Sequence, residues 1–170
     1  NKELAICLKF FKENVQQRST LGKNYEMYYI YSLMSLIDSN TKLGKFNDNT
    51  ALLKEAFDYL KVNKLDQYLP YFISSEGTEA YYAKNYNKAI SKLSEAIRLY
   101  NDQWHHNTEV YYLGLSYWYT GKEKLAIKYL EEIDKHYDQT KKLDPQFRSA
   151  YEILIKYYKA NGNTAKQLEY

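Results

Sequence analysis

Apolar residues recur every three or four positions along most of the chain, which is the spacing of one face of an α-helix. Three N-terminal segments carry such stripes: Leu4, Cys7, Leu8, Phe11 and Val15, then Met27, Ile30, Tyr31, Met34 and Ile37, then Leu52, Leu53, Ala56, Phe57 and Leu60. We interpret residues 24–39 and 51–61 as a helix pair with a long turn at 41–49. With only two prolines and six glycines, the pattern predicts an all-α chain of about eight or nine helices, paired antiparallel.

The second half of the chain repeats itself. A spacing of 37 residues separates three pairs of small or apolar residues, which are Gly77 and Gly114, Ala89 and Ala126, and Leu93 and Leu130. A third copy follows with a shift of 41 residues, which matches Leu113 to Leu154, Tyr117 to Tyr158 and Gly121 to Gly162. We place the extra residues of this copy between helices, at 137–144. Such a period is typical of repeat architectures built from stacked helical units.

The middle copy resembles the tetratricopeptide repeat (TPR), because it reads Val110-x-x-Leu113-Gly114-x-x-Tyr117 and continues with Gly121, Ala126 and Leu130. The first copy departs from this pattern at Glu76 and Ala80, and the third departs from it at Ile155 and Gln167. The resemblance implies a right-handed superhelix of antiparallel helix pairs. It also implies one array over residues 1–170, with degenerate repeats in 1–65 and clearer repeats in 70–170.

Glycine inside a helix costs about 1 kcal/mol relative to alanine, so a glycine there needs a packing reason. We expect Gly114 to allow close approach of the next helix at Ala126. The register then predicts buried side chains in two successive pairs: Leu113, Tyr117, Ala126 and Leu130, and Ala89, Leu93 and Ala96 one repeat earlier.

In the TPR family the first helix of each pair lines a concave surface. Carried onto this sequence, that geometry predicts ten inward residues: Tyr71, Thr78, Tyr81, Tyr82, Tyr111, Leu115, Trp118, Tyr119, Lys156 and Lys159. We expect Tyr82, Tyr111, Trp118 and Tyr119 to be partly exposed and Thr78 to leave room for a ligand side chain. The lysines would attract an acidic group or a carboxy terminus of a peptide. The alternative is that Trp118 and Tyr119 pack against a neighbouring helix.

Charge and residue chemistry narrow the function. The net charge is +3 and the three arginines are scattered, which does not favour nucleic acid as a partner. Cys7 is the single cysteine, and His105, His106 and His136 lack metal-ligand spacing. No phosphate-binding glycine loop or nucleophile motif is present. We therefore expect no enzyme activity, no metal and no cofactor. The 21 tyrosines reflect either an AT-rich coding genome or a contact surface.

The stretch from Leu113 through Tyr129 to Tyr158, with residues 161–163 and Gln167-Leu168, resembles TPR sensor regions of bacterial regulators. This resemblance implies the protein- or peptide-binding region of a larger regulator, including the kind whose TPR groove binds a peptide pheromone. The alternative is a structural adaptor or assembly scaffold without a signalling role. The chain starts at Asn1 and reaches Tyr170 inside an expected helix, so we expect a fragment. We expect it to be soluble and cytoplasmic, or periplasmic if the parent chain is membrane-anchored.

Overall fold

The computed structural model describes residues 6, 9, 23–100, 106–140 and 145–170, and every element within these ranges is helical. Eight α-helices and two short 3-10 helices are present there, without a strand, which confirms the all-α prediction. The α-helices are α3 (Lys23–Lys42), α4 (Phe46–Asn63), α5 (Leu69–Tyr82), α6 (Tyr86–Leu99), α7 (Asn107–Tyr119), α8 (Glu123–Thr140), α9 (Arg148–Ala160) and α10 (Thr164–Glu169). The 3-10 helices are η2 (Asp66–Tyr68) and η3 (Pro145–Phe147). The five residues of the predicted N-terminal stripe that begins at Leu4 lie outside the described residues.

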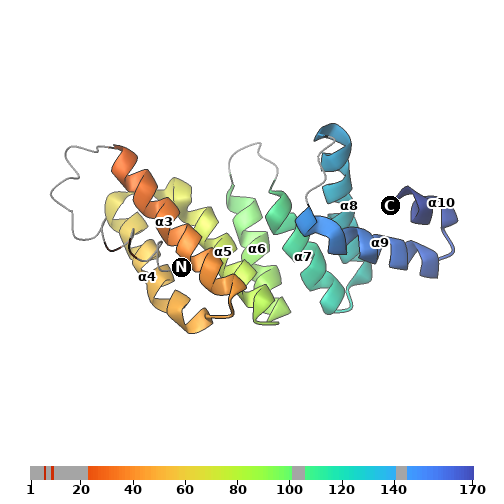
Figure 1. Cartoon of the computed structure of the whole chain (residues 1–170), viewed down its shortest axis with the longest axis horizontal. Helices are drawn as coiled ribbons and strands as arrows, with labels where there is room; N and C mark the ends of the chain where they lie inside the picture. Colours follow the sequence, from red (N-terminus) through yellow and green to blue (C-terminus); the bar gives the residue numbers. More distant parts are fainter. Residues whose placement is uncertain (1–5, 7–8, 10–22, 101–105, 141–144) are drawn as a thin grey trace.

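The helices form a row along the longest axis of the molecule (Figure 1). Helices that follow one another in sequence pack as the pairs α3/α4, α5/α6, α7/α8 and α9/α10. The first helix of each pair also contacts the first helix of the next pair, so α3 lies beside α5, α5 beside α7 and α7 beside α9. The first helices of the four pairs therefore lie side by side in the order in which they occur in the sequence.

The same turn closes all four pairs. Each turn contains one residue in the left-handed region, and these residues are Gly44 (φ +70°), Lys84 (φ +60°), Gly121 (φ +73°) and Gly162 (φ +68°). The following N–H returns to a carbonyl near the end of the first helix, as in a Schellman cap: Lys45 to Asn40, Asn85 to Ala80, Lys122 to Tyr117 and Asn163 to Tyr158. The long turn that we expected at 41–49 is therefore wrong. Three residues suffice because this cap reverses the chain at once.

Two glycines set the distance between paired helices. A Cβ atom added to Gly77 would lie 2.7 Å from Leu93 Cγ, and one added to Gly114 would lie 2.6 Å from Leu130 Cδ2. Both distances are too short for any real Cβ contact, so the predicted reason for these glycines is confirmed. The predicted neighbour is wrong, because the atoms nearest Gly114 belong to Leu130 and Tyr129 rather than to Ala126.

The core follows the predicted register. Six of the seven predicted core side chains are buried, namely Leu113, Ala126 and Leu130 in the α7/α8 pair and Ala89, Leu93 and Ala96 in α6. Tyr117 is the exception, because it is only half-buried. Its ring stacks on Tyr129 with centroids 5.6 Å apart, and Lys122 Nζ lies 5.8 Å from the ring centroid. None of the described helices is long and apolar enough to cross a membrane.

Candidate functional site

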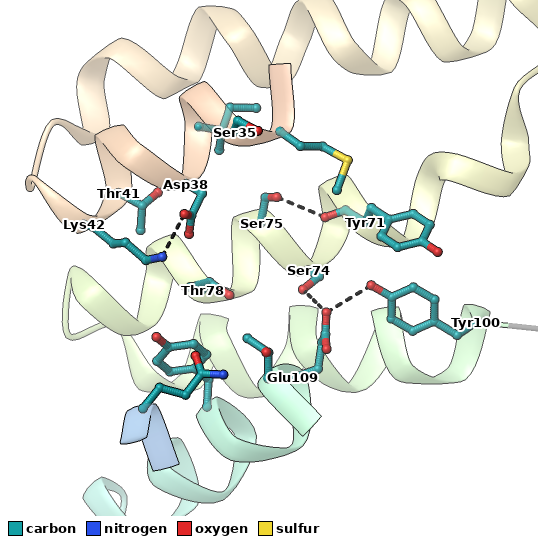
Figure 2. A pocket seen from close by; sticks show the side chains of 15 residues that line it. Ser35, Asp38, Thr41, Lys42, Tyr71, Ser74, Ser75, Thr78, Tyr100 and Glu109 are labelled. Carbon is teal, nitrogen blue, oxygen red and sulfur yellow. Dashed lines mark hydrogen bonds and ion pairs between the residues drawn. The ribbon is translucent and has the colours of Figure 1, made fainter. Parts of the chain in front are cut away.

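A cleft of about 310 Å³ opens where the first helices α3, α5 and α7 lie side by side (Figure 2). Helix α3 lines it with Met34, Ser35, Ile37, Asp38, Thr41 and Lys42, and α5 lines it with Tyr71, Ser74, Ser75 and Thr78. The remaining lining residues are Tyr100, Thr108, Glu109, Tyr112 and Gln146. The cleft therefore spans three successive helix pairs.

Helix α5 makes the middle of the cleft and leaves it open. Tyr71, Ser74, Ser75 and Thr78 are spaced three or four residues apart, so they share one face of the helix. Three of the four carry short side chains. The Ser75 hydroxyl donates to the carbonyl of Tyr71 at 3.0 Å, which holds it against its own helix. The space beside α5 exists because Ser74, Ser75 and Thr78 are small.

Glu109, in the first turn of α7, faces α5 across the cleft (Figure 2). Its Oε1 accepts hydrogen bonds from the Ser74 hydroxyl at 2.7 Å and from the Tyr100 hydroxyl at 3.0 Å. Burial and the Glu109 charge raise the pKa of Tyr100 well above its ordinary value, so this phenol remains a donor at any physiological pH. The Tyr100 ring is itself stacked on His106, with centroids 3.6 Å apart. The carboxylate is thus held at a fixed place in the wall.

The α3 side of the cleft carries an ion pair. Lys42 Nζ lies 2.8 Å from Asp38 Oδ2, one helical turn away (Figure 2). The hydrogen bond from Lys42 to Asp38 raises the pKa of Lys42 above its ordinary value, although burial opposes the shift. Both side chains are more than half exposed. They therefore neutralise each other within the cleft, and the pair adds little to stability.

A buried amide connects the first three described helices beneath the cleft. Asn49 of α4 is fully buried, and its Nδ2 donates to Thr41 Oγ1 at 2.9 Å and to Glu79 Oε2 at 2.6 Å. Asn49 occupies the position that Ala89 and Ala126 hold in the next two pairs. This amide therefore connects α3, α4 and α5, whereas the next two pairs have alanine at the same place.

A tyrosine cluster adjoins the cleft at the C-terminal ends of α5 and α7. The hydroxyls of Tyr82 and Tyr112 are 3.1 Å apart, and the Tyr81 ring lies 4.9 Å from that of Tyr112. Tyr119 stacks on Tyr86 with centroids 4.9 Å apart. Burial, followed by the Tyr82 hydroxyl, raises the pKa of Tyr112 far above its ordinary value. Tyr82 and Tyr119 are exposed at the surface of the cluster.

The ten predicted site residues divide between different surroundings. Tyr71 and Thr78 line the cleft, and Tyr81, Tyr82 and Tyr119 belong to the adjoining tyrosine cluster. Trp118 is half-buried with Lys156 Nζ 6.0 Å from its ring centroid, and Lys156 and Lys159 are exposed on α9. These last three residues do not line the cleft.

The predicted exposure of Tyr111 is wrong, and Leu115 is buried as well. Tyr111 is 6% exposed and Leu115 is 2% exposed. Tyr111 lies against Phe147 of η3, with ring centroids 5.2 Å apart. Helix α9 packs against α7, and Phe147 of η3 lies against Tyr111. Tyr111 and Leu115 therefore fill the seam between α7 and α9, whereas the smaller residues at the equivalent positions of α5 leave theirs open.

Several residues of the cleft were missed from the sequence. Met34, Asp38 and Lys42 are in register with Tyr111, Leu115 and Tyr119 once Gly44 is aligned with Gly121. That glycine was an available signal, because it follows an apolar stripe. The only sequence signal at Glu109 is an acidic residue near the start of a helix. Such a residue indicates where a helix begins rather than a binding site.

The arrangement can hold a ligand by hydrogen bonds, charge and aromatic contact. Among the described residues, no group of three His, Cys, Asp or Glu side chains is placed to hold a metal ion. His105 lies outside the described residues. The comparisons with models of protein families, with curated proteins and with solved structures returned no match.

Proposed function

We propose that this chain is a non-catalytic scaffold whose first helices bind a peptide or an extended segment of another protein. The observation that carries the proposal is the cleft of about 310 Å³ between α3, α5 and α7. This volume is at the small end of ligand sites, so it suits a few side chains of a peptide rather than a whole cofactor. The exposed rings of Tyr82 and Tyr119 beside it offer the rigid contact surface that interfaces favour.

The proposal includes a TPR-like right-handed superhelix as the architecture. Three observations support it, namely the 37-residue spacing of the small residues, the shared turn of the four pairs and the contacts between successive first helices. In a stack of this kind each pair covers the apolar face of its neighbour, and the first helices line one continuous surface. The cleft would then be part of that surface.

Two roles fit a binding scaffold of this kind. In the sensor region of a regulator, which the sequence resembles, occupancy of the cleft would be the input signal. In an adaptor, which is the alternative, the cleft would hold a constant partner. A sensor must exchange its ligand, whereas an assembly scaffold keeps it, so the dissociation rate of the bound peptide separates the two roles.

The test is selection of peptides from a random dodecapeptide library on the 170-residue chain, followed by affinity measurement by fluorescence anisotropy. Thr78→Trp places a large ring in the middle of the cleft and should weaken the selected peptides at least tenfold. Ser91→Trp makes a comparable change on the exposed surface of α6 and should leave their affinity unchanged.

Circular dichroism and thermal melting of both variants must match the parent for the comparison to count. If the selected peptides bind Thr78→Trp as tightly as they bind the parent, the cleft is not the binding site. If the library yields no peptide at all, the proposal of a peptide-binding scaffold fails.

A further inference from the structure

The cleft contains one charge without a counter-charge. Its charged lining residues are Asp38, Lys42 and Glu109, and the first two form an ion pair with each other. None of the ion pairs of the described residues includes Glu109. By formal charge the three groups sum to one negative charge, which is that of Glu109.

The hydrogen bonds to Glu109 fix the carboxylate without neutralising it. Ser74 and Tyr100 are both uncharged donors, and both donate to Oε1. Neither bond uses Oε2. A carboxylate oxygen accepts its strongest hydrogen bonds from a cationic donor, such as an ammonium or guanidinium group. Glu109 is therefore held in the orientation in which it could accept such a donor from a ligand.

The α3 wall of the cleft offers the apolar side chain of Met34 among polar residues, because Ile37 beside it is fully buried. Ser75 and Thr78 of α5 lie between Asp38 of α3 and Glu109 of α7 (Figure 2). Lysine and arginine combine an apolar stem with a charged tip, so each can pack along apolar surface while its tip meets a polar group. An acidic side chain in the same place would instead face the charge of Glu109.

We infer that the cleft receives a lysine or arginine side chain of the bound peptide, with its stem against α3 and its cationic group at Glu109. This inference rests on the proposed function, since it names the chemistry of the segment that the scaffold binds. The tyrosine rings that line the cleft add to it, because the face of a tyrosine attracts a cation that lies within about 6 Å.

The test uses the same random dodecapeptide library on the 170-residue chain. The selected peptides should share a lysine or arginine at one position. Glu109→Gln keeps an oxygen for Ser74 and Tyr100 but removes the charge, and it should weaken these peptides about tenfold to a hundredfold. The matched control is Glu95→Gln on the exposed surface of α6, which should change their affinity less than twofold.

A peptide variant completes the cycle. Replacing its shared basic residue by norleucine should weaken binding to the parent chain by the same factor and should hardly affect binding to Glu109→Gln, because the two changes remove one interaction. Exchanging lysine for arginine in the peptide should retain most of the affinity.

Four results would overturn the inference. If the selected peptides lose affinity on Thr78→Trp but share no basic residue, the cleft binds peptides of another chemistry and the proposed function stands. The same holds if Glu109→Gln binds a basic peptide as tightly as the parent does. If no peptide is selected, or if Thr78→Trp has no effect, the proposed function fails as well.

Discussion

The seam between α5 and α7 and the seam between α7 and α9 are built from equivalent positions, yet only the first is open. Ser74 and Thr78 of α5 correspond to Tyr111 and Leu115 of α7, one 37-residue period later. The α5 residues leave a cleft, whereas Tyr111 and Leu115 are buried against the next unit. The comparison shows that the same backbone arrangement can leave an open cleft or form a packed interface. Which of the two results depends on the side-chain volume at these two positions.

The largest contrast should appear on truncation of these two positions. Leu115→Ala removes a buried side chain and should lower the free energy of unfolding by about 3 kcal/mol. Thr78→Ala, at the equivalent place in the open cleft, should change it by less than about 0.5 kcal/mol. Urea unfolding followed by circular dichroism measures both. Similar effects for the two variants would refute the distinction between an open seam and a filled one.

The packing between the two helices of a pair should be equally sensitive to overpacking in α5/α6 and in α7/α8, although the seams between the pairs differ. Gly77→Leu and Gly114→Leu both force a side chain into the paired helix, where Leu93 and Leu130 already lie closer than a Cβ contact allows. Each should destabilise the chain by about 1–3 kcal/mol or more, because overpacking strains the core. The measurement is the thermal melting temperature. An unchanged value for either variant would show that its helix pair is not packed as described.

A substitution in the turn of the α5/α6 pair should instead raise the stability of the chain. Lys84 occupies the left-handed conformation that glycine adopts at Gly44, Gly121 and Gly162. Lys84→Gly should stabilise the chain by about 1 kcal/mol, since a residue with a Cβ is disfavoured in that conformation. Gly121→Lys should lower the stability by a similar amount. Chemical denaturation of the two variants should therefore give shifts of opposite sign.

The smallest effect concerns an ion pair at the C-terminal end of the row. Glu131 of α8 accepts hydrogen bonds from Lys166 of α10 and from Tyr158. Burial alone would raise the pKa of Glu131, but these hydrogen bonds and the Lys166 charge outweigh it and hold the pKa below its ordinary value. The hydrogen bonds that Lys166 donates to Glu131 and to the Tyr158 hydroxyl raise the pKa of Lys166.

A lowered carboxyl pKa stabilises the fold above the unfolded value and loses that contribution as the pH falls through the folded value. Glu131→Gln should therefore reduce the stability lost between pH 6 and pH 3 by less than about 1 kcal/mol, because Lys166 is partly exposed and the solvent screens the pair. Urea unfolding at both pH values measures the difference. A loss of stability on acidification equal to that of the parent would show that the pair contributes nothing.

Much of the fold could be predicted because the signals are local. The apolar stripes predicted the helices, and the spacing of Gly77 and Gly114 identified where paired helices approach closely. The turn at 43–45 was missed because Gly44 was not recognised as the equivalent of Gly121. An apolar stripe indicates that a helix exists, but it does not specify the geometry that ends it.

The site was harder to predict for a different reason. The exposure of a side chain on a first helix depends on how closely the next helix pair packs against it. The spacing of residues in the sequence does not give that distance. Tyr111 was expected to be exposed, yet Phe147 covers it. Glu109 is held in the cleft by hydrogen bonds from Tyr100, nine residues before it, and from Ser74 of α5, 35 residues before it. Contacts of this kind appear only in the folded chain.

The most direct test of the central claim is a nuclear Overhauser measurement between a selected peptide and the methyl groups of the chain. A peptide held in the cleft should give cross-peaks to the methyl groups of Met34 and Thr78, which line it. It should give none to Leu115, which is buried in the filled seam. Cross-peaks confined to exposed methyl groups elsewhere, such as those of Val62 and Leu125, would contradict the account.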